Sequence, residues 1–226
     1  MNKREFYSQP KIAQTYDELR FGGASGAWVN AREIDLALSL LPPFQQALDL
    51  GCGTGRLTRA LGQRGKTIGM DASSAMLANA QANNPSGFVQ GDTFTLPFAD
   101  ASFDAVAALR VVFHFANVDA LMREVARVVE PRGVLVFDTY RWSPRAWLPL
   151  GAARWGSGVF AHAPALIERS ARQAGFQPAQ RESCFLFSPY VYRRLPFAAV
   201  RALARIERHL PARLRARVFW KFVRVD

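Results

Sequence analysis

The sequence predicts one α/β domain, with a mostly parallel sheet covered by helices on both faces. Segments with strand and helix patterns alternate from about residue 29 through the middle of the chain, and a glycine-rich turn joins the first strand to its helix. Residues 134–139 form an unbroken apolar run, as in a strand buried on both faces. At 226 residues, half of them apolar, the chain is large enough to bury one core. We therefore expect a single domain over residues 1–226.

Local signals predict each element in turn. Helical periodicity and capping residues predict helices at 55–63, 73–81, 118–129, 165–174 and 197–209. Pro131 and Gly133 mark the turn before the fifth strand, and Gly175 stops the helix before the sixth. Apolar segments bounded by turn residues predict strands at 47–50, 67–70, 88–90, 103–109, 134–139, 176–187 and 217–225.

Positive charge is concentrated toward the end of the sequence. The formal net charge is +11, and residues 181–226 hold eleven Lys and Arg against three acidic residues. Arg201, Arg205 and Arg208 are spaced so that they form one stripe on a helix. Such a stripe is typical of a solvated face, although an anionic membrane surface or an RNA backbone would also suit it.

The two cysteines indicate a reducing compartment. Cys52 and Cys184 are far apart in sequence, and Cys52 lies inside the glycine-rich turn, where a disulfide would block a ligand. Residues 1–10 are polar and charged, and no apolar run reaches the ~18 residues of a membrane span. We expect a cytoplasmic protein, with peripheral membrane contact through the basic segment as a further possibility.

The strongest functional signal is the segment Asp49-Leu50-Gly51-Cys52-Gly53-Thr54-Gly55, where a strand gives way to a helix. Glycines let the backbone approach a ligand closely, and the N-terminus of a helix offers free N–H groups to an anion. A tight turn without a ligand is the alternative interpretation. A dinucleotide loop has the pattern G-x-G-x-x-G, whereas here the third glycine comes one place early, which disfavours a nicotinamide cofactor.

Acidic residues follow the next two strands. Asp71 comes twenty residues after Gly51, where a carboxylate accepts hydrogen bonds from both ribose hydroxyls. Asp92 can accept a hydrogen bond from an adenine amine, with a simple loop role as the alternative. Asp104 begins a strand, so a turn or cap role is expected. No cluster of His, Cys and acidic residues has metal-ligand spacing, so we expect no metal.

These motifs resemble the class I methyltransferases, in particular the group that methylates small molecules. The resemblance covers about residues 28–140, through ALDLGCGTGRLTRAL, IGMDASSAML, GDTFTLPFADASFDAV and MREVARVVEPRGVLVFDTY. It implies a Rossmann-like three-layer sandwich with a seven-stranded sheet whose last strand is antiparallel. It also implies S-adenosylmethionine as cofactor and S-adenosylhomocysteine as product. The implied cofactor-binding residues are Asp49, Gly51, Cys52, Gly53, Gly55, Asp71, Ala72, Met76, Asp92, Thr93 and Leu109.

The resemblance divides the chain into three parts: lid helices at 1–28, the cofactor-binding core at 29–140, and an acceptor-side and basic segment at 141–226. In the lid, Tyr16 and Arg20 are expected to close over the cofactor, with Arg20 paired to its methionine carboxylate. A plain solvated helix face is the alternative for both residues.

Past the fourth strand, residues 109–114 resemble a family segment that carries one or two histidines facing the pocket. Phe113 replaces the first and His114 matches the second. With an ordinary pKa near ~6.5, His114 suits a general base, and a structural histidine is the alternative. Arg110 departs from the small or acidic residues of related sequences, which leaves the acceptor chemistry open.

An aromatic segment follows the fifth strand, where ligands bind in open α/β sheets. Trp142, Trp147 and Trp155, with Pro144 and Pro149, would roof an apolar acceptor pocket, or they form a core-packing loop. Phe187, Tyr190 and Tyr192 are expected on the same side.

The predicted function is methyl transfer from S-adenosylmethionine to a small or lipophilic acceptor, at oxygen, nitrogen or carbon. A sulfonium methyl is already activated, so alignment of the acceptor is the main task of the protein. The alternatives are a tRNA or rRNA methyltransferase, a nicotinamide-dependent oxidoreductase, and a non-catalytic protein that binds the cofactor or a membrane.

Overall fold

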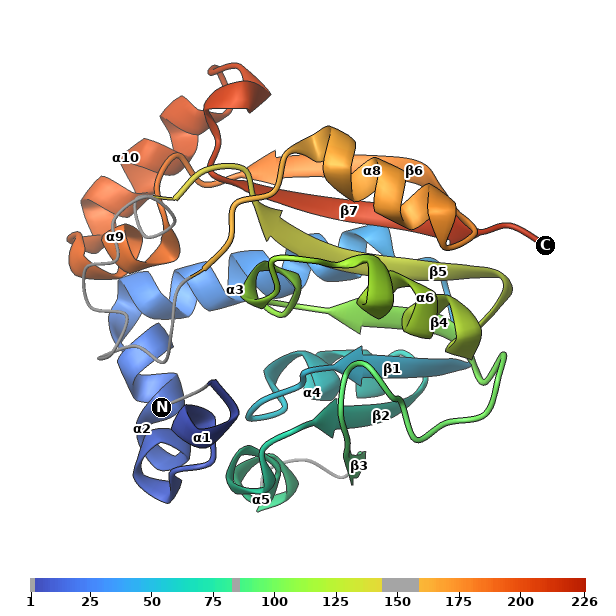
Figure 1. Cartoon of the computed structure of the whole chain (residues 1–226). Helices are drawn as coiled ribbons and strands as arrows, with labels where there is room; N and C mark the ends of the chain where they lie inside the picture. The colour runs from blue at the N-terminus through green and yellow to red at the C-terminus, as the bar shows by residue number, and fades with distance from the viewer. Residues whose placement is uncertain (1–2, 83–85, 144–158) are drawn as a thin grey trace.

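A computed structural model describes residues 3–82, 86–143 and 159–226. Within them, the seven strands that the resemblance implied form one sheet, in the order β3-β2-β1-β4-β5-β7-β6 (Figure 1). Every neighbouring pair that excludes β7 is parallel, whereas β7 runs antiparallel to both β5 and β6. The strands are β1 Gln46–Leu50, β2 Lys66–Asp71, β3 Gly87–Gln90, β4 Phe103–Ala108, β5 Val129–Tyr140, β6 Phe176–Cys184 and β7 Arg217–Arg224.

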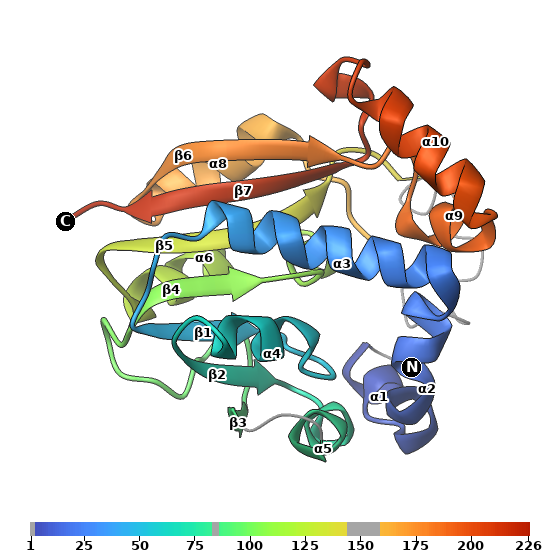
Figure 2. The same cartoon turned by 180° about the vertical axis from the view of Figure 1, so that it is seen from behind.

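Helices cover both faces of the sheet, which makes three layers. Figures 1 and 2 show α3 (Gly23–Leu40) and α4 (Arg56–Gly62) on one face and α6 (Asp119–Val128) and α8 (Pro164–Gln173) on the other. Along each strand, apolar residues at alternating positions point to opposite faces and fill the two interfaces between the sheet and its helix layers. For example, Val106 packs in the cluster with α6 and α8, whereas Ala105 packs in the cluster with α3 and α4.

The first helices lie at one end of the sheet, near α5 (Ser74–Ala82). α1 (Lys3–Tyr7) packs on α2 (Pro10–Phe21), which in turn packs on α3 and α5. The expected division between residues 28 and 29 falls inside α3. That helix is continuous because Val29, Leu36 and Leu40 face the core along its whole length.

The ends of several elements differ from the predictions. The expected helix at 118–129 ends at Val128, and the strand expected from residue 134 begins at Val129, because a register shift against β4 accommodates the turn residues. The sixth strand ends at Cys184 rather than 187, since Phe185 has a φ of 61° that turns the chain. Two helices then follow, α9 (Pro189–Arg194), which the sequence did not predict, and α10 (Phe197–Glu207), which ends two residues early.

Short 3-10 turns complete the described chain: η1 Val112–His114 after β4 and η2 Ala212–Leu214 before β7. Among the described helices, none combines the length and the apolar character needed to cross a membrane.

Candidate active site at the carboxyl edge of the sheet

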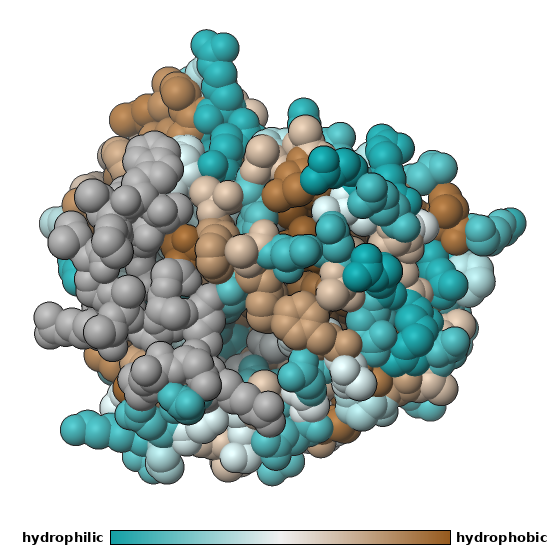
Figure 3. All heavy atoms as spheres, in the orientation of Figure 1, coloured by the Kyte–Doolittle hydropathy of each residue, from teal (hydrophilic) through white to brown (hydrophobic). Residues whose placement is uncertain are grey.

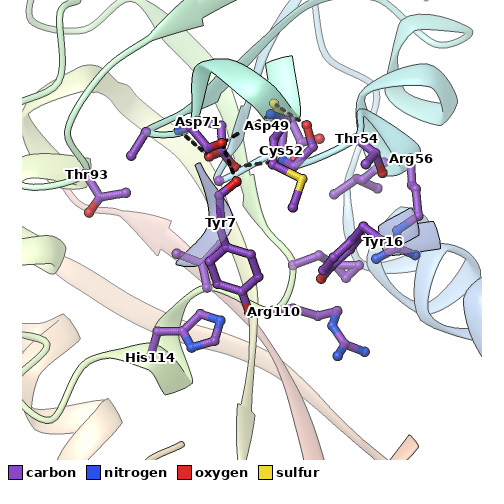
Figure 4. Close-up of a pocket in the computed structure, with 18 of the residues that line it drawn as sticks. Tyr7, Tyr16, Asp49, Cys52, Thr54, Arg56, Asp71, Thr93, Arg110 and His114 are labelled. Carbon is purple, nitrogen blue, oxygen red and sulfur yellow. Dashed lines mark hydrogen bonds between the residues drawn. The ribbon is translucent and has the colours of Figure 1, made fainter. Parts of the chain in front are cut away.

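A cavity of about 260 Å³ lies where β1, β2, β3 and β4 end, beneath the first two helices (Figure 4). This edge is where open α/β sheets bind their ligands. Eleven of the thirteen residues predicted to bind the cofactor line it, and the candidate base His114 does so as well. Gly55 and Arg20 are the two exceptions. The lining residues that were predicted are Tyr16, Asp49, Gly51, Cys52, Gly53, Asp71, Ala72, Met76, Asp92, Thr93 and Leu109.

The glycine loop owes its shape to left-handed backbone at three places. Gly51, Gly53 and Gly55 have φ of 69°, 55° and 76°, a region that other residues adopt only under strain. A Cβ on Gly51 would also overlap the side chain of Val111. The loop is anchored to β2, because the N–H groups of residues 51 and 52 both donate to the carbonyl of Met70.

Asp71 holds the loop as well as facing the cavity. Its Oδ2 accepts a hydrogen bond from the N–H of Gly53 at 2.8 Å, and its Oδ1 accepts one from the N–H of Ser73 at 2.9 Å. Burial raises the pKa of this carboxyl, and the backbone hydrogen bonds oppose the rise. The contact with Gly53 shows that the second strand positions the loop directly.

Asp49 is buried below the loop. Burial raises the pKa of its carboxyl to about 6, although the Thr58 hydroxyl donates a hydrogen bond to Oδ2 at 2.6 Å. An acid with this pKa is partly protonated near neutral pH. A cation placed in the cavity would therefore favour its ionised form.

The other two acidic residues have different positions. Asp92 and Thr93 line the cavity, and the Asp92 carboxylate also accepts a hydrogen bond from the N–H of Phe94 at 2.8 Å. Asp104 lies outside the cavity and accepts hydrogen bonds from the N–H groups of Gln45 and Gln46, at 2.6 and 3.0 Å. Asp104 thus has a structural role, but it fixes the start of β1 from β4 rather than forming the local turn or cap that was expected.

The lid differs in part from the prediction. Tyr7 and Tyr16 line the cavity, but the structure does not bring Arg20 to its wall. Arg20 is buried instead between the rings of Tyr16 and Tyr190, with its guanidinium carbon 5.5 and 4.9 Å from the two ring centroids. The helical spacing of Tyr16 and Arg20 did not reveal this, because Tyr190 comes from a helix that the sequence did not predict.

His114 lies in the cavity wall at the end of η1. Its ring is 6.1 Å from that of Tyr7, so the lid and the segment after β4 meet here. Phe113 is buried behind it and packs against both the His114 ring and Tyr140, with ring centroids 4.8 and 4.7 Å away. The structure thus distinguishes the two positions: the histidine faces the cavity and the phenylalanine faces the core.

The predicted aromatic roof is described only at its edges. Trp147, Trp155, Pro144 and Pro149 lie outside the described residues. Trp142 is described, and its Nε1 donates to the carbonyl of Leu214 at 3.4 Å. Phe187 is exposed at the surface. The expectation for Tyr192 on the acceptor side was wrong: its side chain is fully buried in the core and stacks on Trp28, with ring centroids 6.0 Å apart.

Sequence reasoning missed a group of buried charges beside the cavity. Arg56 and Arg110 line the cavity, and both pair with the buried carboxylate of Glu33. Arg217 of β7 pairs with the same carboxylate and with Asp138 of β5. The departure of Arg110 from the family pattern was the one available signal. In the part of the chain that the structure describes, no group of His, Cys, Asp and Glu is arranged to hold a metal.

The sheet order, the glycine loop and the acids that follow successive strands define a class I methyltransferase domain. The family model of this methyltransferase domain matches residues 48–137. Residues 48–137 therefore carry a methyltransferase domain, and the sheet of the chain has the class I methyltransferase fold.

Among curated relatives, the chain is 32% identical over 204 residues to a bifunctional protein of biotin biosynthesis from Cellvibrio japonicus, covering 89% of this chain and 39% of the relative. It is 30% identical to a ubiquinone biosynthesis O-methyltransferase from Azorhizobium caulinodans, covering 59% of each. The chain thus spans less than two thirds of either relative.

Two solved structures share the fold at low sequence identity. A complex of the Haloferax volcanii Trm112 methyltransferase activator with a methyltransferase matches with a TM-score of 0.71 and 19% identity, covering 100% of this chain and 99% of that one. Geranyl diphosphate C-methyltransferase from Streptomyces coelicolor, solved with S-adenosyl-L-homocysteine, matches with a TM-score of 0.68 and 16% identity, covering 88% and 80%.

Proposed function

We propose that this protein transfers the methyl group of S-adenosylmethionine to a small, lipophilic acceptor. The observation that carries the proposal is that one cavity collects the glycine loop, the acids after β2 and β3, and the aromatic lid. In this arrangement the loop and Asp49 hold the methionine end of the cofactor, Asp71 holds the ribose, and Asp92 with Thr93 binds the adenine. Met76 and Leu109 supply apolar contacts to the adenine ring.

The acceptor side is lined by rings. Tyr7, Tyr16, Phe94, Phe115 and His114 all reach the cavity (Figure 4 labels three of them). Aromatic walls suit an apolar acceptor and exclude water from the reacting atoms. The quinone and biotin pathways named for the two relatives are consistent with small acceptors of this kind.

The cofactor supplies an activated methyl group when it is bound, so the residues here mainly position the acceptor in line with it. His114 would accept the proton if the acceptor is a hydroxyl, because its ring faces the cavity. For an acceptor that loses no proton before transfer, the same ring serves only as part of the wall.

Calorimetric titration with S-adenosylmethionine, S-adenosylhomocysteine and NAD tests the cofactor assignment. We expect the first two to bind with micromolar affinity and NAD to produce no heat. Binding of NAD alone would refute the proposal. Transfer of a labelled methyl group to components of a lipid-soluble extract then distinguishes an enzyme from a non-catalytic protein, and salt-sensitive retention of RNA on filters would favour the RNA alternative.

We also propose that the protein works in the cytoplasm and contacts anionic membranes through α10 and η2. Both cysteines are buried and unpaired by disulfides, which agrees with a reducing compartment. Phe197, Ile206 and Leu214 are 40 to 50% exposed, and the arginine stripe is exposed beside them. Figure 3 shows apolar side chains gathered over α10. This combination of exposed apolar and cationic side chains suits an anionic lipid surface.

A further inference from the structure

One buried carboxylate is shared by three guanidinium groups. Glu33 of α3 is fully buried, and its oxygens lie 3.2 Å from Arg110 Nη1 and 3.8 Å from Arg56 Nη2. Arg217 donates a further, shorter hydrogen bond to Glu33 Oε1. A single carboxylate neutralises one positive charge, so Glu33 alone does not balance these three.

A second acid compensates only one of the three arginines. Asp138 Oδ2 accepts hydrogen bonds from Arg217 Nε, at 3.0 Å, and from Nη2. Its Oδ1 accepts the backbone N–H of Arg110 at 2.6 Å, which fixes the main chain there. Within the described residues, the ion pairs of this cluster therefore join three cations to two anions, which leaves one surplus positive charge among the paired groups. Asp17 and Asp49 also interact electrostatically with Arg56, without forming an ion pair with it.

That surplus charge faces the cavity. Arg217 is fully buried, whereas Arg56 and Arg110 both line the cavity and retain slight exposure. Their guanidinium carbons lie 3.7 and 5.4 Å from the centroid of the Phe21 ring, so the two groups are held close to the same ring. A desolvated cation without a full partner is costly, and an anionic ligand removes that cost.

The arginines lie away from the adenosine end of the proposed cofactor site. Figure 4 shows Arg56, Tyr16 and Arg110 on the side of the cavity opposite Thr93, with Arg110 and His114 along the same lower edge. Arg56 directly follows the glycine loop, whereas Arg110 follows β4, as does His114. Arg110 is therefore the cation on the side of the candidate base.

We propose that Arg110 binds a carboxylate group of the methyl acceptor, so that the acceptor is a small apolar acid. This inference rests on the proposed function, because it assigns a substrate class to the same cavity. The carboxylate would face the planar guanidinium, which suits carboxylates geometrically, and the apolar body would lie against Tyr7 and Tyr16. Glu33 accepts a hydrogen bond from the Arg110 guanidinium and so holds it in place. The hydrogen bond from the Arg110 backbone N–H to Asp138 fixes the main chain from which the side chain extends.

The test uses benzoate and benzamide, two rings of the same shape that differ in charge, on protein saturated with S-adenosylhomocysteine. Ligand-detected NMR titration should show benzoate binding at least tenfold more tightly than benzamide. Arg110→Gln should remove that preference. Arg59→Gln, on the exposed face of the same α4 helix that begins with Arg56, is the control and should keep it. Equal affinity of the wild type for both compounds would overturn the inference.

A parallel measurement of S-adenosylhomocysteine affinity separates the two proposals. If the wild type fails to bind it, the proposed function itself fails. If Arg110→Gln weakens its binding tenfold or more, Arg110 serves the carboxylate of the cofactor and the inference is wrong. Arg110→Lys retains the positive charge and the pairing with Glu33, so it serves as a control for misfolding caused by Arg110→Gln. It should keep part of the preference for benzoate, and loss of the entire preference in a folded lysine variant would contradict a charge-based site.

Discussion

The two sides of the cavity are built in different ways. On the cofactor side, the loop after β1, the acid at the end of β2 and the acid after β3 come from 45 consecutive residues, 49–93, and each contact joins neighbouring strand ends. On the arginine side, Glu33, Arg110, Asp138 and Arg217 come from α3, the end of β4, β5 and β7. The first side depends on backbone shape and the second on charge balance between distant segments.

This difference indicates how each side tolerates change. A loop that needs left-handed φ fails when a side chain is added, whereas a charge cluster fails when one partner is removed. The following predictions test that distinction, in order of decreasing effect.

Arg217→Met should be the most damaging substitution for stability. It leaves Glu33 and Asp138 buried with fewer cationic partners, and breaking a buried pair in this way costs about 3–5 kcal/mol. Urea denaturation measures the loss. Arg181→Met, which removes an exposed pair with Glu168, is the control and should cost less than about 1 kcal/mol. Similar losses for both variants would show that the cluster is not a structural centre.

Gly51→Ala should lower stability by roughly 2–4 kcal/mol, from left-handed strain and from overlap with Val111. Gly53→Ala is the matched comparison, because it has the same sign of φ but nothing within 4 Å of an added Cβ. It should cost only about 1 kcal/mol. Thermal unfolding of the two variants separates strain from overlap, and equal losses would argue against the contact with Val111.

Asp49 should make stability depend on pH in an unusual direction. Its pKa is about 6 in the folded protein and near 3.8 when unfolded, so the folded state holds the proton more tightly. Stability from this group is present below about pH 4 and is lost as the pH rises through 6. The wild type should therefore lose roughly 1–3 kcal/mol more of its free energy of unfolding between pH 4 and pH 8 than Asp49→Asn does.

Urea denaturation at the two pH values checks the Asp49 prediction. Thr58→Val removes the hydrogen bond that favours the carboxylate, so it should enlarge the loss between pH 4 and pH 8. An unchanged pH profile in Asp49→Asn would mean that another group titrates in this window.

Asp71→Ala should weaken binding of S-adenosylhomocysteine by about an order of magnitude, the value of a charge-assisted hydrogen-bond pair. The reason is twofold, since the carboxylate is proposed to hold the ribose and it also anchors Gly53. Calorimetry measures the effect. Asp104→Ala is the control, because this acid also binds backbone N–H groups but lies outside the cavity. The affinity of this variant for S-adenosylhomocysteine should equal that of the wild type. Unchanged affinity in Asp71→Ala would mean that the ribose lies elsewhere.

The cofactor side was predictable because its signals are local. The loop glycines, Asp71 and Asp92 each follow a strand that the sequence reveals, and parallel strands place such residues at one edge. The predictions failed where a residue depends on a distant partner. Arg20 packs against Tyr190, and Tyr192 faces inward, because α9 folds back onto α2 and α3.

By itself, the sequence determined the class of fold, the loop and twelve of the residues that line the cavity, since strand pattern and glycine placement act over a few residues. Only the tertiary structure decided which charges face the acceptor. Arg217 is 184 residues from Glu33. Because β7 runs antiparallel beside β5 with Arg217 opposite Tyr140, the Arg217 side chain reaches diagonally to Asp138 and also to Glu33. No local pattern encodes such a contact, because it forms only when long-range strand pairing and helix packing bring the groups together.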